Sequence, residues 1–338
     1  MKKQFGTLPT GEQANLYTIS CGGITAAVTD FGANLVSLLV PGRDGTVADV
    51  VLGYDNPKSY LENGGCLGAV VGRNANRIHH ARFLLNGETV QLAENDRGNN
   101  LHSGPDMYFT RMWQVESHTA EAIRLTLLSP DGDQGFPGNA RVSVTYSLDE
   151  TGALKITYDG VCDRDTVFNM TNHTYFNLAG HQHPESAMDQ VLLINADFYT
   201  ASDEKNITTG ELTDVTGTPM DFRSPKPIRA GLDIPYEPLR MQGGYDHNFV
   251  IRSNPCAVLS DPGSGRTLTI TTDCPGVQLY GGNFLNCIGK EGVAYGKFGG
   301  VALETQFFPD AVNKPQWKQP FVKAGIPYHS ETVYRFSI

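Results

Sequence analysis

Alternation of apolar and polar residues with a period of two dominates this chain and predicts β-strands. Residues 16–20 and 24–29 alternate in this way on either side of Cys21-Gly22-Gly23, which predicts a hairpin. Similar patterns, or short apolar runs between turns, predict strands at 31–41, 50–54, 113–115, 123–128, 140–148, 154–160, 168–178, 191–194, 267–272 and 301–308. Residues 154–160 are expected to pair with 140–148. Almost no window keeps helical periodicity for three turns, so we expect an all-β fold with many turns.

Composition agrees with this pattern. The 338 residues include 37 Gly and 19 Pro, and Val, Ile, Thr, Tyr and Phe are frequent, as in β-rich proteins. The length allows one large domain or two ordinary ones. The chain contains no linker, low-complexity segment or internal repeat.

Charge and cysteine usage narrow the class of protein. The net charge is -10 with a pI near 5.3, and Lys and Arg are scattered, so neither nucleic acid nor an anionic membrane is expected as a partner. No apolar run approaches the length of a membrane span, and the basic N-terminus lacks the apolar core of a secretory signal. The six cysteines show no C-x-x-C spacing, which favours free thiols in the cytoplasm over disulfides or a zinc site.

One carboxylate stands out among the expected strands. Glu304 is flanked by the apolar residues Val301, Leu303, Phe307 and Phe308. A glutamate in a buried run is costly to desolvate, and burial raises its pKa, which suits a general base near neutral pH. Alternation also permits a second interpretation, in which Val301 and Leu303 face the core and Glu304 faces solvent. This stretch alone leaves both interpretations open.

Residues 64–78 combine four glycines with a cluster of polar side chains. They contain no G-x-x-x-x-G-K-[ST] motif, so we interpret the glycines as sites of close backbone packing rather than as a nucleotide-binding loop. The polar cluster consists of Arg73, Asn74, Asn76 and Arg77. Its many hydrogen-bond donors suit sugar hydroxyls or a carboxylate, and an ordinary polar surface is the alternative.

Further candidates lie in other polar segments. His173 lies in 168–178, where polar and aromatic residues interleave, and it is a candidate proton donor; a hydrogen-bonded core histidine is the alternative. His102 lies in the turn-rich loop 99–105 and, taken alone, is expected to be structural. Asp246 stands at the start of a strand, and Gln278 stands near glycine turns.

Five segments, in this order, resemble the galactose mutarotase (aldose 1-epimerase) family: residues 72–78, 100–102, 172–178, 245–249 and 304–310. The resemblance extends from Phe31 to the C-terminus. It implies a single domain over residues 1–338, folded as a large antiparallel β-sandwich with a sugar bound in an open cleft across one face.

The resemblance also implies roles for individual residues. The family's catalytic base corresponds to Glu304 and its acid to His173. Its sugar contacts correspond to Asn76, Arg77, His102, Tyr175, Asp246 and Gln278. The chain departs from the family pattern at Ser103, where glycine usually follows the histidine, and at Gly281, in a turn that often carries threonine. These departures bear on loop detail and sugar preference.

The activity implied is interconversion of the α and β anomers of free aldohexoses such as galactose and glucose. One base removes the proton of the C1 hydroxyl while one acid protonates the ring oxygen; the ring opens, C1 rotates, and the same pair closes the ring on the other face. This chemistry requires no cofactor or metal. Because the acid must be protonated near neutral pH, we expect nearby carboxylates to raise the pKa of His173. A monomer or a homodimer is expected.

Three other functions fit parts of the sequence. A glycoside hydrolase would use Glu304 and Asp246 as its carboxylate pair. A hexose-6-phosphate 1-epimerase would need basic residues for the phosphate, for which Arg73 and Arg77 are the candidates. A non-catalytic carbohydrate-binding sandwich would need aromatic platforms but no acid and base.

Overall fold

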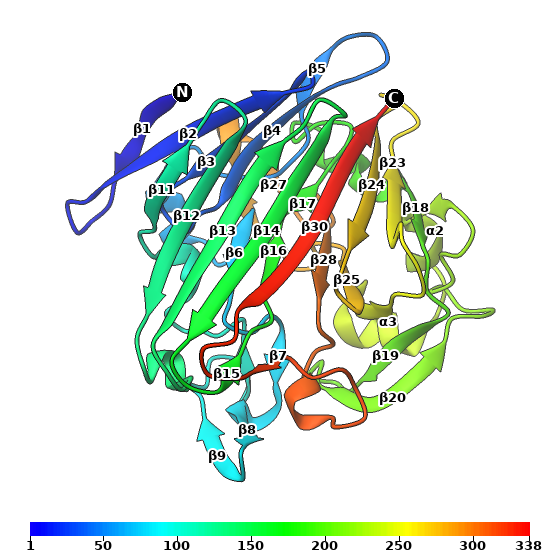
Figure 1. Ribbon diagram of the computed structural model, residues 1–338. Coiled ribbons are helices and arrows are strands. Elements are labelled where there is room, and N and C mark those ends of the chain that lie inside the picture. The colour runs from blue at the N-terminus through cyan, green and yellow to red at the C-terminus, as the bar shows by residue number, and fades with distance from the viewer.

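The computed structural model describes residues 1–338 and consists mainly of antiparallel strands (Figure 1). Strands account for 45% of the residues and helices for 11%, which confirms the all-β prediction. The largest sheet has nine strands, in the order β11 (Gln114–His118), β12 (Ala122–Ser129), β13 (Ala140–Leu148), β14 (Ala153–Cys162), β30 (Tyr328–Ser337), β24 (Thr267–Thr272), β23 (Ala257–Ser260), β18 (Val191–Ile194) and β21 (Lys226–Pro227). In Figure 1 the red C-terminal strand β30 lies between β14 and β24. The predicted pairing of 154–160 with 140–148 is confirmed by β14 and β13.

Two further sheets complete the main architecture. A six-stranded sheet has the order β17 (Tyr175–Phe176), β28 (Val301–Gln306), β25 (Gly276–Tyr280), β22 (Asp246–Val250), β19 (Phe198–Ser202) and β20 (Thr208–Asp214). A five-stranded sheet has the order β1 (Lys2–Thr7), β2 (Gln13–Cys21), β3 (Ile24–Thr29), β4 (Leu35–Pro41) and β5 (Val47–Asp49). The antiparallel pair β2 and β3 confirms the predicted hairpin.

The remaining elements are short. Five strand pairs are β6 (Ala69–Val71) with β16 (Thr171–His173), β7 (Arg77–Ile78) with β10 (Asn100–Leu101), β8 (Arg82–Leu85) with β9 (Glu88–Gln91), β15 (Thr166–Val167) with β29 (Phe321–Val322), and β26 (Cys287–Ile288) with β27 (Ala294–Tyr295). The α-helices are α1 (Pro57–Glu62), α2 (Arg229–Leu232) and α3 (Glu237–Gln242). Six 3₁₀ segments occupy His79–Ala81, Tyr108–Thr110, Asp133–Gly135, Pro184–Asp189, Lys290–Gly292 and Ala311–Asn313. None of the helices combines the length and apolarity that a bilayer crossing needs.

The main hydrophobic core is formed by the nine-stranded sheet together with the six-stranded and five-stranded sheets. Ile156 of β14 and Tyr334 of β30 belong to the same buried cluster as Leu303 of β28. Because successive residues of a strand point to opposite faces, burial of Leu303 in this core turns Glu304 to the other face of β28. The predicted alternation along 301–305 is therefore confirmed. The second face is not open to solvent, however, since every residue of β28 is buried.

Two predicted strands differ in extent from those observed. The strand predicted at 31–41 begins at Leu35, because Gly32 and Ala33 have φ angles of 76° and 51° and form a turn. The strand predicted at 50–54 is not observed there; the strand in this region is β5, at Val47–Asp49. Within 50–54 only Val51 makes a bridge, with Phe176. This apolar run crosses toward β17 instead of extending the five-stranded sheet.

The segment 168–178, predicted as one extended stretch, is divided. Strand β16 pairs with β6, whereas β17 pairs with β28. Thr174 lies between the two strands, and its hydroxyl donates a hydrogen bond to the side-chain oxygen of Asn172. The chain thus changes partner at Thr174, and this change brings His173 beside β28.

Two glycines of residues 64–78 show the close packing that the sequence predicts. A Cβ at Gly68, where φ is 67°, would lie 2.0 Å from the carbonyl oxygen of Leu35. A Cβ at Gly72 would lie 2.2 Å from the sulfur of Met170. Neither position can therefore accept a larger residue without movement of its neighbours.

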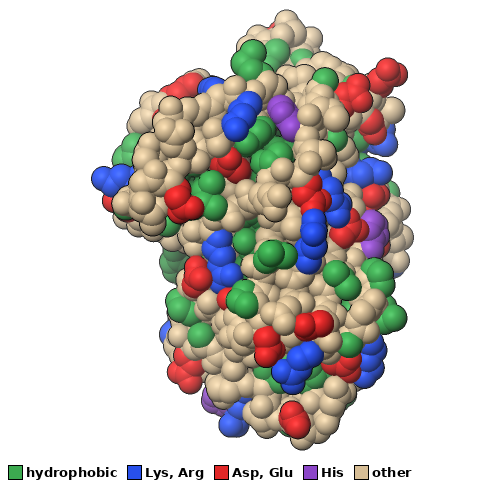
Figure 2. All heavy atoms as spheres, turned by 60° about the vertical axis from the view of Figure 1, so that its left-hand side comes forward, with side chains coloured by type: hydrophobic (Ala, Val, Ile, Leu, Met, Phe, Trp, Pro, Cys, Tyr) green, Lys and Arg blue, Asp and Glu red, His purple; other side chains and the backbone are tan.

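The surface carries charges of both signs. On the face drawn in Figure 2, Lys and Arg side chains are interspersed with Asp and Glu, and hydrophobic side chains form only small clusters. This face therefore has no broad basic area of the kind that contacts a phosphate backbone.

Candidate active site

A cleft with a volume of about 490 Å³ opens over the face of the six-stranded sheet that is turned away from the core. Residues from β7, β17, β22, β25 and β28 line it together with the loops around 62–66 and 284–287. Seven of the eight site residues expected from the sequence lie in its wall: Asn76, Arg77, His102, His173, Tyr175, Asp246 and Glu304. Gln278 lies behind this wall, where its side-chain amide donates to Asp246 (2.6 Å).

The register of the strands explains why these side chains meet. Gln278 of β25 stands opposite Glu304 of β28, and Asp246 of β22 stands opposite Tyr280 of β25. Side chains that face one another across neighbouring strands point to the same side of the sheet. Tyr280 also lines the cleft, although sequence reasoning did not single it out. The signal was present, because Tyr280 follows Gln278 by two residues and so shares its face.

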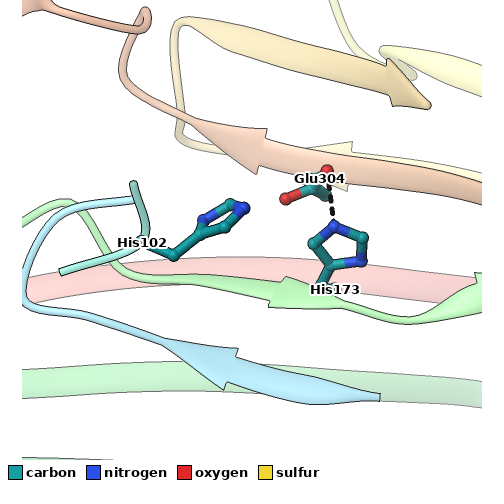
Figure 3. Close-up of side chains that lie close together, drawn as sticks. All are labelled: His102, His173 and Glu304. Carbon is teal, nitrogen blue, oxygen red and sulfur yellow. Dashed lines mark ion pairs between the residues drawn. The ribbon is translucent and has the colours of Figure 1, made fainter. Parts of the chain in front are cut away.

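The acid and base expected from the sequence are in contact. Nε2 of His173 lies 3.5 Å from Oε1 of Glu304, and both side chains are less than a tenth exposed. Figure 3 shows the two side chains reaching toward each other from different strands. Nδ1 of His173 and Oε2 of Glu304 have no hydrogen-bond partner in the protein. These two buried atoms therefore retain unused hydrogen-bonding capacity.

Burial controls the protonation of this pair. It lowers the pKa of His173 to about 4. It also raises the pKa of Glu304 well above its usual value, and the charge of Asp246 adds to this increase while Arg77 opposes it. The expectation that carboxylates raise the pKa of His173 is therefore wrong, because burial disfavours the charged imidazolium and lowers the pKa instead. Burial by itself favours the uncharged forms of both side chains.

His102 stands on the other side of Glu304 (Figure 3), with its ring 5.6 Å from that of His173. Its Nδ1 accepts a hydrogen bond from the backbone N–H of Asn76 (3.2 Å). Burial, followed by the proximity of His173 and Arg77, lowers the pKa of His102 well below its usual value. A neutral imidazole whose Nδ1 accepts must carry its proton on Nε2. His102 therefore presents an N–H donor at its second nitrogen.

Two histidines and one carboxylate at this spot raise the question of a metal. The nearest ligand atoms of His102, His173 and Glu304 lie within 4.8 Å of one another, a grouping that the spacing of the histidines in the sequence does not reveal. A metal-binding imidazole nitrogen must offer a lone pair. Nε2 of His102 has none to offer while Asn76 donates to Nδ1. The three residues thus fit a metal poorly, and the metal-free mechanism stays a prediction.

Asp246 and Arg77 supply the opposite charges of the cleft. Burial raises the pKa of Asp246, and Arg77, Gln278 and Asn206 oppose that shift. Arg77 is held by Asp96, whose Oδ2 lies 2.8 Å from its Nε. The guanidinium therefore retains its terminal N–H groups for a ligand, because only Nε is engaged by the carboxylate.

Arg73 does not belong to the cleft, so it serves neither as a sugar contact of the polar cluster nor as the phosphate contact that a hexose-6-phosphate 1-epimerase would need. Its side chain is buried and donates to Ser129 and to several backbone carbonyl oxygens, among them that of Gly138 (2.8 Å). These bonds join the loop at Arg73 to the turn after β12. The sequence shows two arginines four residues apart but not which one turns outward.

The two departures from the family pattern have local explanations. The hydroxyl of Ser103 donates to the carbonyl of Asn74 (3.0 Å) and accepts from its N–H (2.8 Å), so it ties the His102 loop to the loop of Asn76. The N–H of Gly281 donates to the carbonyl of Tyr245 (3.0 Å). A Cβ at Gly281 would meet the side chain of Asn283 at 3.1 Å. Both residues fix backbone at the edge of the cleft.

Comparison with known proteins identifies the family. The model of the aldose 1-epimerase family matches residues 15–335. The chain is 39% identical to an aldose 1-epimerase of Haemophilus influenzae over 340 residues, which covers 97% of each protein. It is 38% identical to a galactose mutarotase of Bos taurus, covering 99% of this chain and 97% of that protein.

Solved structures agree. The aldose epimerase homologue of C. elegans superposes with a TM-score of 0.89 at 31% identity and covers 96% of this chain and 99% of its own. The galactose 1-epimerase of Lactobacillus acidophilus superposes with a TM-score of 0.87 at 28% identity and covers 100% and 98%. Together with the sequence matches over nearly the full length, these similarities show that the chain belongs to the aldose 1-epimerase family.

Proposed function

We propose that this protein is a mutarotase that interconverts the α and β anomers of free aldohexoses such as galactose and glucose, with Glu304 as base and His173 as acid. The observation that supports this most directly is the buried contact of 3.5 Å between these two side chains in the wall of a cleft. A base and an acid in reach of one sugar ring are what ring opening requires.

The pair needs only one titratable proton for the whole cycle. In the reactive arrangement this proton is on His173 and Glu304 is ionised. Glu304 then takes the proton of the C1 hydroxyl while His173 gives its proton to the ring oxygen, and the bond between C1 and the ring oxygen breaks. The products are the open-chain aldehyde, a protonated Glu304 and a neutral His173. After rotation about the C1–C2 bond, the same steps run in reverse and restore the charges.

Burial favours this ring opening, because it disfavours the charged forms of both side chains and both are neutral once the ring is open. The bound sugar supplies the opposing effect, because its C1 hydroxyl donates to the carboxylate and its ring oxygen accepts from the imidazolium. These hydrogen bonds stabilise the charged forms in the closed-ring complex. The two effects together keep the charged and neutral arrangements close in energy.

The other cleft residues have roles in binding. Asp246 can accept from sugar hydroxyls, and Arg77 and Nε2 of His102 can donate to them. Tyr175 and Tyr280, whose rings lie 5.9 Å apart, supply apolar surface beside His173. In this proposal Asn76 acts by orienting His102 through its backbone, and Gln278 acts by holding Asp246.

The charges of the cleft disfavour a sugar phosphate. Arg77 is the only Lys or Arg in the wall, whereas Glu62, Asp246 and Glu304 are acidic. Arg77 is moreover already paired with Asp96. A dianionic phosphate would enter a site with an excess of carboxylates, so we favour a neutral sugar over a hexose 6-phosphate.

Polarimetry tests this function. Freshly dissolved α-D-galactose and α-D-glucose should approach their equilibrium rotation faster with the protein than without it. Glucose 6-phosphate should show little acceleration. No acceleration with any free aldose, or release of new reducing ends from glycosides, would overturn the proposal.

A further inference from the structure

Two amides hold the carboxylate of Asp246 from behind. Nε2 of Gln278 donates to Oδ1 at 2.6 Å, and Nδ2 of Asn206 donates to Oδ2 at 2.7 Å. Asn206 is 6% exposed and lies outside the segments that suggested the family. Because each carboxylate oxygen has one amide donor, the plane of the carboxylate is fixed. The remaining lone pairs stay available for a ligand.

The turn that carries Asn206 is itself well ordered. Oδ1 of Asp203 accepts from the N–H groups of Lys205 (2.8 Å) and Ile207 (2.9 Å), and the backbone carbonyl of Asp203 accepts from the N–H of Asn206 (2.9 Å). Asn206 has a φ of 60°, a left-handed conformation that Asn tolerates better than most residues. The turn thus presents its amide to Asp246 in one orientation.

Arg97 connects this turn to the other charged residue of the cleft. Its guanidinium donates to the carbonyl oxygens of Glu204 (3.3 Å) and Lys205 (2.9 Å). Its Nε donates to Oδ1 of Asp96 (3.2 Å), while Oδ2 of the same carboxylate accepts from Nε of Arg77 (2.8 Å). A chain of hydrogen bonds therefore runs from Arg77 through Asp96 and Arg97 to the turn of Asn206, and from there to Asp246.

We propose that Asn206 and Arg97 are positioning residues that fix the carboxylate of Asp246 relative to the guanidinium of Arg77 and so set the affinity for the sugar. Arg77 and Asp246 belong to different sheets, in β7 and β22, and the bridge through Asp96, Arg97 and Asn206 joins them outside the cleft. Groups held in place before binding lose less entropy when the ligand arrives. This inference rests on the proposed function, in which both residues contact the sugar.

The bridge makes no direct contact with the reacting pair. Neither Asn206 nor Arg97 is hydrogen-bonded to Glu304 or His173, so removing the bridge should weaken binding of the sugar in the ground state and in the transition state alike. Such a loss raises KM and leaves kcat nearly unchanged. Asn206 also stabilises the ionised form of Asp246, so its loss should raise the pKa of Asp246 further. The increase in KM should then grow as the pH falls.

The variant Asn206→Gly tests the bridge without backbone strain, because glycine adopts the left-handed conformation freely. We expect KM for galactose to rise about tenfold, as for loss of a hydrogen bond to a charged group, with kcat within about twofold. Asn206→Asp, which sets a second carboxylate against Asp246, should raise KM more. Arg97→Ala should raise KM about threefold, since it acts through the turn. Arg164→Ala removes an arginine of similar exposure that pairs with Asp131 outside the cleft, and it should change nothing.

Initial mutarotation rates against galactose concentration at pH 5, 6 and 7 give both constants, and thermal unfolding verifies that each variant is folded. A folded Asn206→Gly with the KM of the unaltered protein at all three pH values would overturn the inference, as would a loss confined to kcat. Calorimetric titration with galactose at anomeric equilibrium gives the Kd of each variant and so compares affinities without a rate measurement. An unaltered protein that binds galactose but does not accelerate mutarotation would refute the proposed function alone, and one that does not bind it would refute both.

Discussion

Replacing Glu304 by Gln separates the chemical role of this residue from its effect on stability. The change keeps the shape of the side chain and removes its basicity. General base catalysis contributes roughly 10²- to 10⁴-fold, so the mutarotation rate should fall by about two to four orders of magnitude. This loss corresponds to about 3–5 kcal/mol of transition-state stabilisation.

Stability should change in the opposite direction. Glu304 is 2% exposed and one of its oxygens has no partner, so its ionised form is costly in the folded protein. Its folded-state pKa lies well above that in the unfolded chain, which means that folding takes up a proton between these two pKa values. The free energy of unfolding therefore falls as the pH rises through this window, by up to about 1.4 kcal/mol per pH unit. Glu304→Gln removes this penalty and should unfold at a higher temperature, by a margin that grows with pH.

Thermal unfolding of both proteins between pH 5 and 8, together with polarimetry, measures these effects. Glu185→Gln is the matched control, because Glu185 is largely exposed and lies outside the cleft. A folded Glu304→Gln with near-normal activity would refute the assignment of the base. A difference in Tm that does not depend on pH would refute the reasoning about burial.

Four further predictions concern the pH profile, metal dependence and backbone packing. Because the charge of Asp246 raises the pKa of Glu304, Asp246→Asn should move the alkaline limb of the rate profile toward acid and raise KM, and coinciding limbs would contradict this. The active pair carries one proton, and a second proton binds at His173 near pH 4, so the rate should fall on the acid side near pH 4. A fall near pH 6.5 would contradict the lowered pKa of His173. Dialysis against a strong chelator should leave the rate unchanged, whereas a loss reversed by one divalent ion would show a metal requirement. Gly68→Ala should destabilise the protein by at least about 2 kcal/mol in urea unfolding, more than Gly87→Ala, whose Cβ would meet nothing within 4 Å.

Period-two alternation predicts that Glu304 and Leu303 lie on opposite faces of one strand, which the structure confirms, but it left open whether Glu304 is buried or faces solvent. Alternation does not show what covers that face. The observed burial of Glu304 depends on β16 and on the loop of His102, which come from elsewhere in the chain.

Other features depend on contacts that no local pattern encodes. Arg73 and Arg77 have the same donors, and only the packing of the turn after β12 buries the first. The pKa of His173 is lowered by burial, and the degree of burial of one side chain is set by the packing of the whole fold. Asn206 carries no distinctive signal in the sequence, since its function depends on a turn that meets β22 only in the folded chain.

The change of strand partner at Thr174 has a consequence for how activity arises during folding. His173 is the last residue of β16, which pairs with β6, whereas Glu304 lies in the six-stranded sheet, and His102 comes from a third segment. Contacts between segments so distant in sequence are slow to form, because the intervening chain must first be ordered. Partially assembled molecules can contain every strand and still lack the acid beside the base. Mutarotation should therefore recover later in a refolding reaction than the circular dichroism signal of the sheets. Recovery of activity would then measure the step in which His173 reaches Glu304.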